Sequence, residues 1–145
     1  MANVFDVAKY ILHQKGEMTA MKLQKLVYYS QAWSLVWDGK PLFREKIRAW
    51  ANGPVVPSLY AEHRGAFIVN EKFFTNGDPQ KLTKTEKSTI NAVVKVYGKK
   101  TPQFLSELTH NEDPWKNARK GLDIGERGNQ EITLSAMAEY YESLI

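Results

Sequence analysis

The sequence contains no cysteine, which excludes a disulfide framework and any zinc site built on thiolates. It has no apolar run of membrane-spanning length. Its first ten residues, MANVFDVAKY, carry an acid and lack the separate apolar stretch of a signal peptide. We therefore expect a cytoplasmic protein that has no membrane partner.

The common motifs of catalysis and cofactor binding are also missing. No P-loop, dinucleotide-binding glycine motif, HExxH, GxSxG or EF-hand loop occurs. The three histidines, His13, His63 and His110, lack the spacing of metal ligands, so we predict no metal and no cofactor. His110 lies close to Glu112 and Asp113, a grouping more typical of a helix end than of an active site. We expect a protein that is not an enzyme, and a small enzyme using His110 or His63 is the third interpretation.

The charge is small and uneven. The chain has 20 basic and 16 acidic side chains, for a net charge of +4. Residues 1–72 hold ten basic and six acidic side chains, whereas residues 73–145 hold ten of each. A basic half is suited to an acidic protein or a phosphate backbone, although an excess of this size is also typical of an ordinary solvated lysine surface.

One helix is expected at the centre of the fold. The stretch 22–37, KLQKLVYYSQAWSLVW, is apolar on most sides of a helix, so other elements must wrap it. Its predicted polar edge consists of Lys22, Gln24, Lys25 and Gln31. With 145 residues and no linker, the chain is predicted to form a single domain, 1–145, around a buried helix at about 20–37.

The remaining pattern is mainly helical. Helices are predicted over 4–15, from Pro57, over 83–97, from Thr101, from Asp113 and over about 135–144. A small β element is expected near residues 46–56, because Ile47 and Ala49 alternate with Arg48 and Trp50. Four apolar side chains are expected to pin the connector 65–80 to the core: Phe67, Val69, Phe73 and Phe74. The predicted fold class is therefore mainly α (α+β), a compact helical domain.

Two binding functions follow from local patterns. The helix over 4–15, Gly16 and the helix that Thr19 caps resemble a helix-turn-helix, which would present Lys22, Gln24 and Lys25 to DNA. The rest of the second helix is too apolar for a DNA groove, so a DNA-binding regulator is the alternative interpretation. The turn sequence GPVVP, between Trp50 and Tyr60, would instead display aromatic side chains to a partner protein.

Three segments resemble the SocA-like, or Panacea, family, earlier catalogued as phage-associated GepA-like proteins. They are KLQKLVYYSQAW (22–33), PLFREKIRAWANGPVVPSLY (41–60) and THNEDPWKNAR (109–119). The resemblance runs in order over about residues 4–142. The matched signature positions include Trp33, Trp50, Gly53, Pro54, Pro57, His110 and Trp115.

This resemblance implies a bacterial or prophage antitoxin that neutralises a co-encoded toxin by direct protein contact, with no catalytic residues. The signature does not say which residues touch the toxin. From the basic first half and the turn, we predict a contact patch on the polar edge of the central helix and the GPVVP segment. Its members are Lys22, Lys25, Arg48, Asn52, Tyr60 and Arg64. Neither the oligomeric state nor the identity of the toxin follows from these patterns.

Overall fold

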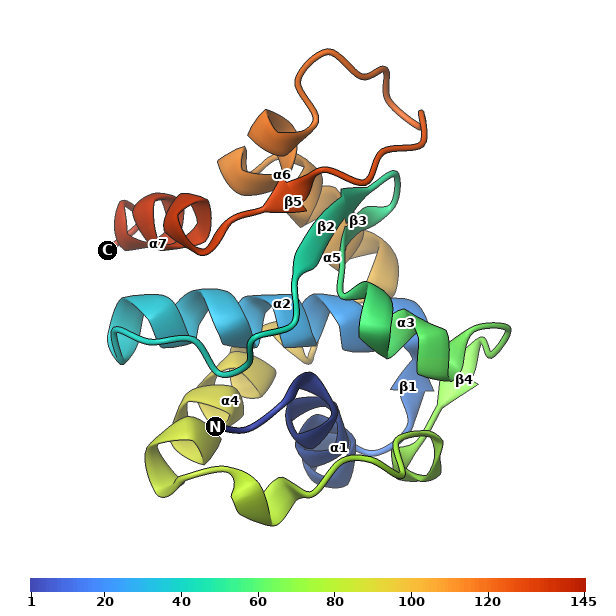
Figure 1. Cartoon of the computed structure of the whole chain (residues 1–145), viewed down its shortest axis with the longest axis vertical. Helices are drawn as coiled ribbons and strands as arrows, with labels where there is room; N and C mark the ends of the chain where they lie inside the picture. Colours follow the sequence, from blue (N-terminus) through green and yellow to red (C-terminus); the bar gives the residue numbers. More distant parts are fainter.

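The central helix is the axis of the fold. A computed structural model describes residues 1–145, in which α2 (Ala20–Trp37) crosses the middle of the molecule (Figure 1). The Thr19 hydroxyl caps this helix by accepting a hydrogen bond from the Lys22 amide at 3.1 Å. The predicted buried helix is thereby confirmed, and so is the mainly α fold.

Two helices that the sequence predicts cover one side of α2. They are α1 (Val4–Lys15) and α4 (Lys84–Tyr97), which lie below α2 in Figure 1. Each begins with a reciprocal capping box, formed in α4 by Thr83 and Glu86 as the sequence indicates. Each capping box satisfies amides that the first turn of its helix would otherwise leave unpaired.

The other helices are shorter. They are α3 (Pro57–His63), α5 (Pro102–His110), α6 (Asp113–Ala118) and α7 (Leu134–Glu142). Two short 3₁₀ helices, η1 (Glu71–Phe73) and η2 (Pro79–Lys81), lie between α3 and α4. A proline in the first turn opens each of α3, α5 and α6, where its missing amide costs nothing. No helix is both long and apolar enough to cross a membrane.

Two small antiparallel sheets complete the fold. In the first, β2 (Ile47–Trp50) lies between β3 (Gly53–Val55) and β5 (Glu131–Ile132). The alternating burial along β2 confirms the predicted half-buried strand. The second sheet pairs β1 (Met18–Thr19) with β4 (Ile68–Val69) and was not predicted, because strands of two residues carry no periodicity.

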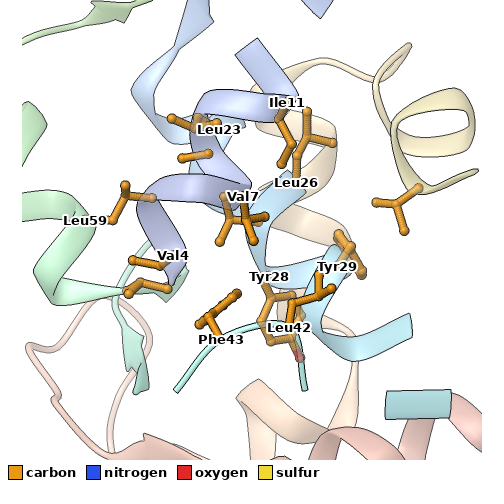
Figure 2. Close-up of a cluster of buried hydrophobic side chains, with 14 of the residues drawn as sticks. Val4, Val7, Ile11, Leu23, Leu26, Tyr28, Tyr29, Leu42, Phe43 and Leu59 are labelled. Carbon is orange, nitrogen blue, oxygen red and sulfur yellow. The ribbon is translucent and has the colours of Figure 1, made fainter. Parts of the chain in front are cut away.

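The hydrophobic core forms where α1 crosses α2. Figure 2 shows side chains from both helices meeting those of the 42–43 segment and α3, among them Val7, Ile11, Leu26, Phe43 and Leu59. Some predicted core contacts are wrong. Phe67 is 78% exposed and Phe73 also reaches solvent, so only Val69 and Phe74 pin the connector. At the end of α2, Trp37 is 48% exposed, because the elements around the helix do not cover its last turn.

The predicted polar edge of α2 is wrong in a more informative way. Gln24 and Gln31 are buried, and each binds the backbone of the segment that crosses the helix. The Gln31 carbonyl oxygen accepts from the Leu42 amide at 2.7 Å, and its amide donates to the Phe43 carbonyl at 2.9 Å. Gln24 likewise accepts from the Val56 amide at 3.0 Å and donates to the Val56 carbonyl at 3.4 Å. These glutamines therefore replace the strand partner that the segment lacks.

A buried carboxyl group joins the end of α5 to α2 and α7. Glu112 Oε1 accepts hydrogen bonds from the Tyr29 and Tyr141 hydroxyls, both at 2.7 Å, and the Tyr141 and Tyr28 hydroxyls are 3.0 Å apart. Burial raises the pKa of the Glu112 carboxyl above its ordinary value, although the two tyrosine hydrogen bonds lower it in part. The protonated carboxyl is therefore favoured more in the folded state than in the unfolded chain.

We expect E112Q to remove a pH dependence of folding. A raised carboxyl pKa stabilises the folded chain below the unfolded pKa of about 4.3, and this contribution is lost as the pH rises through the folded pKa. The wild-type chain should therefore lose stability relative to E112Q, which keeps the Oε1 acceptor, as the pH rises from about 4 through the raised pKa of Glu112. Urea unfolding of both proteins across this range measures the difference. A constant difference would contradict the buried carboxyl.

A matched tryptophan pair tests the burial along α2. Trp33 is 8% exposed, stacks on Trp37 and donates its indole N–H to the Tyr97 hydroxyl at 2.9 Å. W33A should lower the free energy of unfolding by about 3–5 kcal/mol. W37A, in the half-exposed neighbour, should lower it by less than about 1 kcal/mol. Equal losses in urea unfolding would show that the packing around α2 is misassigned.

Candidate functional site

A cleft of about 1090 Å³ opens beside the first turns of α2. Its other walls are α3, the turn between β2 and β3, and the loop at 127–129. Gln24 and Lys25 come from the helix, while Trp50, Tyr60 and Phe67 contribute aromatic rings. Half of its sixteen lining residues are hydrophobic, as is usual for a binding site.

Lys25 is buried rather than part of an exposed patch. It is 1% exposed, and its ammonium donates to the Pro54 carbonyl at 3.2 Å. The only two ion pairs in the structure lie elsewhere, His13 with Glu71 and Lys46 with Glu131, so no carboxylate balances this charge. Burial lowers the pKa of Lys25 to about 8. The sequence missed this burial because a lysine on an amphipathic helix is normally solvated.

The turn between β2 and β3 requires a glycine at position 53. Its φ of +125° is a conformation that side-chain-bearing residues rarely adopt. An added Cβ would also lie 2.6 Å from Lys25 Cε and 3.1 Å from both Lys25 Nζ and Thr109 Oγ1. The turn therefore packs directly on the buried lysine.

Helices α5 and α6 hold the turn from behind. The Ser106 hydroxyl donates to the Asn52 carbonyl at 2.6 Å, and the Trp115 indole donates to the Trp50 carbonyl at 2.9 Å. A guanidinium nitrogen of Arg119 donates to the Ala49 carbonyl, also at 2.9 Å. The rigidity of the turn therefore depends on residues far away in the sequence, among them the signature residue Trp115.

The two candidate catalytic histidines serve different contacts. His63 is buried at the cleft, with Nε2 3.0 Å from the Gln24 amide nitrogen, and burial lowers its pKa. His110 stacks on Trp115 at 3.9 Å between ring centroids, and its buried Nε2 has no hydrogen-bond partner. Burial, followed by the charge of Lys25, lowers the pKa of His110. No group of three or more His, Asp or Glu side chains is arranged to hold a metal ion.

The predicted contact patch is only partly assembled. Asn52 and Tyr60 are exposed and line the cleft, but Lys25 lines it from a buried position. The other three predicted members, Lys22, Arg48 and Arg64, have some exposure but lie outside the cleft lining. The sequence did not predict Arg127 as a site residue, and it wrongly predicted that Phe67 is buried. Both belong to irregular segments, in which no periodicity indicates where a side chain points.

The signature residues outside the cleft have structural roles. Trp33 packs in the core against Tyr141, and Pro57 sets the first turn of α3.

The structure does not support the helix-turn-helix interpretation. Gln24 and Lys25 would have to reach DNA bases, but both are buried. Helices α1, α4 and α7 also enclose α2.

The fold and the cleft define a class: a small α-rich domain that presents a clamped turn beside an aromatic, cationic cleft. The sequence model of the family described as "Antitoxin SocA-like, Panacea domain" matches residues 23–116. The chain therefore belongs to the SocA-like, Panacea-domain family of antitoxins. Searches of curated proteins and of solved structures return no match.

A pair of glycine variants tests the packing of the turn on Lys25. Gly53 and Gly65 both have positive φ, but a Cβ at Gly65 would meet nothing within 4 Å. G65A should therefore cost only backbone strain of about 1 kcal/mol. G53A should cost about 1–3 kcal/mol more, because the new Cβ would displace the Lys25 ammonium from the Pro54 carbonyl. Thermal or urea unfolding compares them, and equal costs would argue against a tight Gly53–Lys25 contact.

Proposed function

We propose that this chain is an antitoxin that neutralises a co-encoded toxin by direct protein–protein binding in the cytoplasm, without catalysing a reaction. Family membership supports an antitoxin-type role with a protein partner in general. The observation that carries the finer proposal is the turn between β2 and β3, which α2, α5 and α6 hold rigidly at the rim of an aromatic cleft.

The cleft rim has the composition of an interface. Phe67 is 78% exposed and Tyr60 is 36% exposed, and Met21 also reaches solvent. Aromatic side chains that a partner can enclose supply most of the binding energy at protein interfaces. A stable complex needs about 800 Å² of buried surface on each partner, so the rim would form the centre of a wider contact.

The rim is also fixed before binding. The Phe67 carbonyl accepts the Ala20 amide at 2.9 Å, which fixes the backbone of Phe67 at the start of α2. The Trp50 ring packs edge-on against Tyr60, and its indole donates to Asn129 Oδ1 at 3.0 Å. Because few of these groups must be ordered on association, the entropy cost of binding is small.

Co-expression with the product of the adjacent gene tests the proposal. If that product arrests growth and this chain restores growth in a complex that co-purifies, neutralisation by binding is supported. A harmless neighbour that does not co-purify would contradict it. Growth restored without any complex would contradict direct binding and favour a catalytic or regulatory role.

The rim itself is tested by a double variant of its exposed aromatics. Y60S/F67S should weaken toxin binding by about 2 kcal/mol or more, and growth rescue should fall with it. V96S/I124S is the matched control, because it removes two exposed apolar side chains that do not line the cleft. Calorimetry or surface binding measures both affinities. Equal affinities of the two variants would place the interface elsewhere.

A further inference from the structure

The cleft is lined by positive charge without any negative charge. None of its sixteen lining residues is Asp or Glu, whereas Lys25 and Arg127 both line it. The whole chain has nearly balanced charge, so this composition is a local property of the cleft. Such a surface complements a ligand that is apolar in body and carries an anionic group.

The buried ammonium of Lys25 lacks a counter-charge. Of its three protons, only one meets an acceptor in the chain, the neutral Pro54 carbonyl. A buried ammonium that is neither ion-paired nor fully hydrogen-bonded destabilises the folded state. Its one hydrogen bond holds the turn, which an apolar side chain could not do, but the neutral carbonyl leaves the charge unbalanced beside a cleft without acidic residues. The cation is therefore suited to an anionic ligand group that enters the cleft.

We propose that the cleft accepts a carboxylate-bearing apolar segment of the partner protein, and that Lys25 and Arg127 pair with this carboxylate. This inference rests on the proposed function, since it names the chemistry of the toxin surface. Phe67 and Tyr60 enclose the apolar part of the segment. The inserted carboxylate supplies the counter-charge that the free chain lacks.

The titratable and charged groups around Lys25 determine the pH range in which its own titration can be followed. His110 faces it from α5, His63 and Tyr60 line the cleft from α3, and Arg127 lines it from the loop. Arg119, which follows α6, is bound to the Ala49 carbonyl, and Glu112, which precedes that helix, is bound to two tyrosines. The pKa values of both histidines are lowered, so Lys25, with a pKa of about 8, is the cleft group that titrates between pH 7.5 and 9.5.

Affinity measurements on three variants of this chain test the proposal. K25M removes the cation with little change in side-chain volume, and K22M removes a lysine of the same helix that does not line the cleft. K25M should weaken binding of the toxin about 30-fold or more, whereas K22M should change it less than about threefold. The exposed variant R127Q also weakens binding, and it provides a readout that cannot be attributed to misfolding.

Each Asp and Glu of the toxin is then changed in turn to its amide. One of these changes should weaken binding by about the same factor as K25M. When K25M is combined with that toxin variant in a double-mutant cycle, the second substitution should reduce the affinity little further. Binding by the wild-type chain should also weaken as the pH rises from 7.5 to 9.5, because a carboxylate partner raises the pKa of Lys25 and binding takes up a proton. That dependence should be absent in K25M and present in K22M.

The outcomes separate this proposal from the proposed function. Tight binding by the wild-type chain with unchanged affinity of K25M and R127Q would overturn the carboxylate pairing and leave neutralisation intact. Weaker binding by K25M that no single toxin carboxylate reproduces would show that Lys25 acts by holding the turn or by meeting another anion, and would also overturn it. If the wild-type chain binds no toxin at all, both proposals fail.

Discussion

The fold depends on buried polar side chains of α2 that satisfy the backbone of the segment crossing it. Gln31 binds the backbone at residues 42–43, Gln24 binds Val56, and Lys25 binds the Pro54 carbonyl. Residues 42–43 and Val56 lie outside β2 and β3, so their amides and carbonyls lack strand partners. Buried backbone groups without partners would cost several times the net gain of an ordinary hydrogen bond. The helix therefore works both as a hydrophobic core and as a partner for hydrogen bonding.

The same constraint prepares the binding surface. Because Lys25, Ser106 and Trp115 each bind a carbonyl in or beside the turn between β2 and β3, the turn is held from three helices. The cost is a buried, unbalanced ammonium next to a cleft. An arrangement that lowers stability in the free chain and would be compensated in a complex is expected at a binding site. The proposed toxin-binding function and the proposed carboxylate pairing both derive from this one arrangement.

Sequence patterns were most reliable where a local cause decides the structure. The periodicity of α1 and α4, the prolines that open α3, α5 and α6, and the alternation along β2 all act over short stretches of sequence, and the elements that they predict were confirmed. The errors concern side-chain direction, both in segments without periodicity and on the polar edge predicted for α2. Phe67 was expected inside and is exposed, and Lys25 was expected outside and is buried.

By itself, the sequence determined a mainly helical chain around a buried central helix, and its motifs indicated an antitoxin family that the family match then confirmed. Only the tertiary structure decided that Gln24, Lys25 and Gln31 face the crossing segment, and that Phe67 and Arg127 join Tyr60 around one cleft. The physical reason is that polarity predicts solvation only when no backbone competes for the side chain. Which backbone passes a given helix is fixed by contacts between distant segments, and helical periodicity does not encode them.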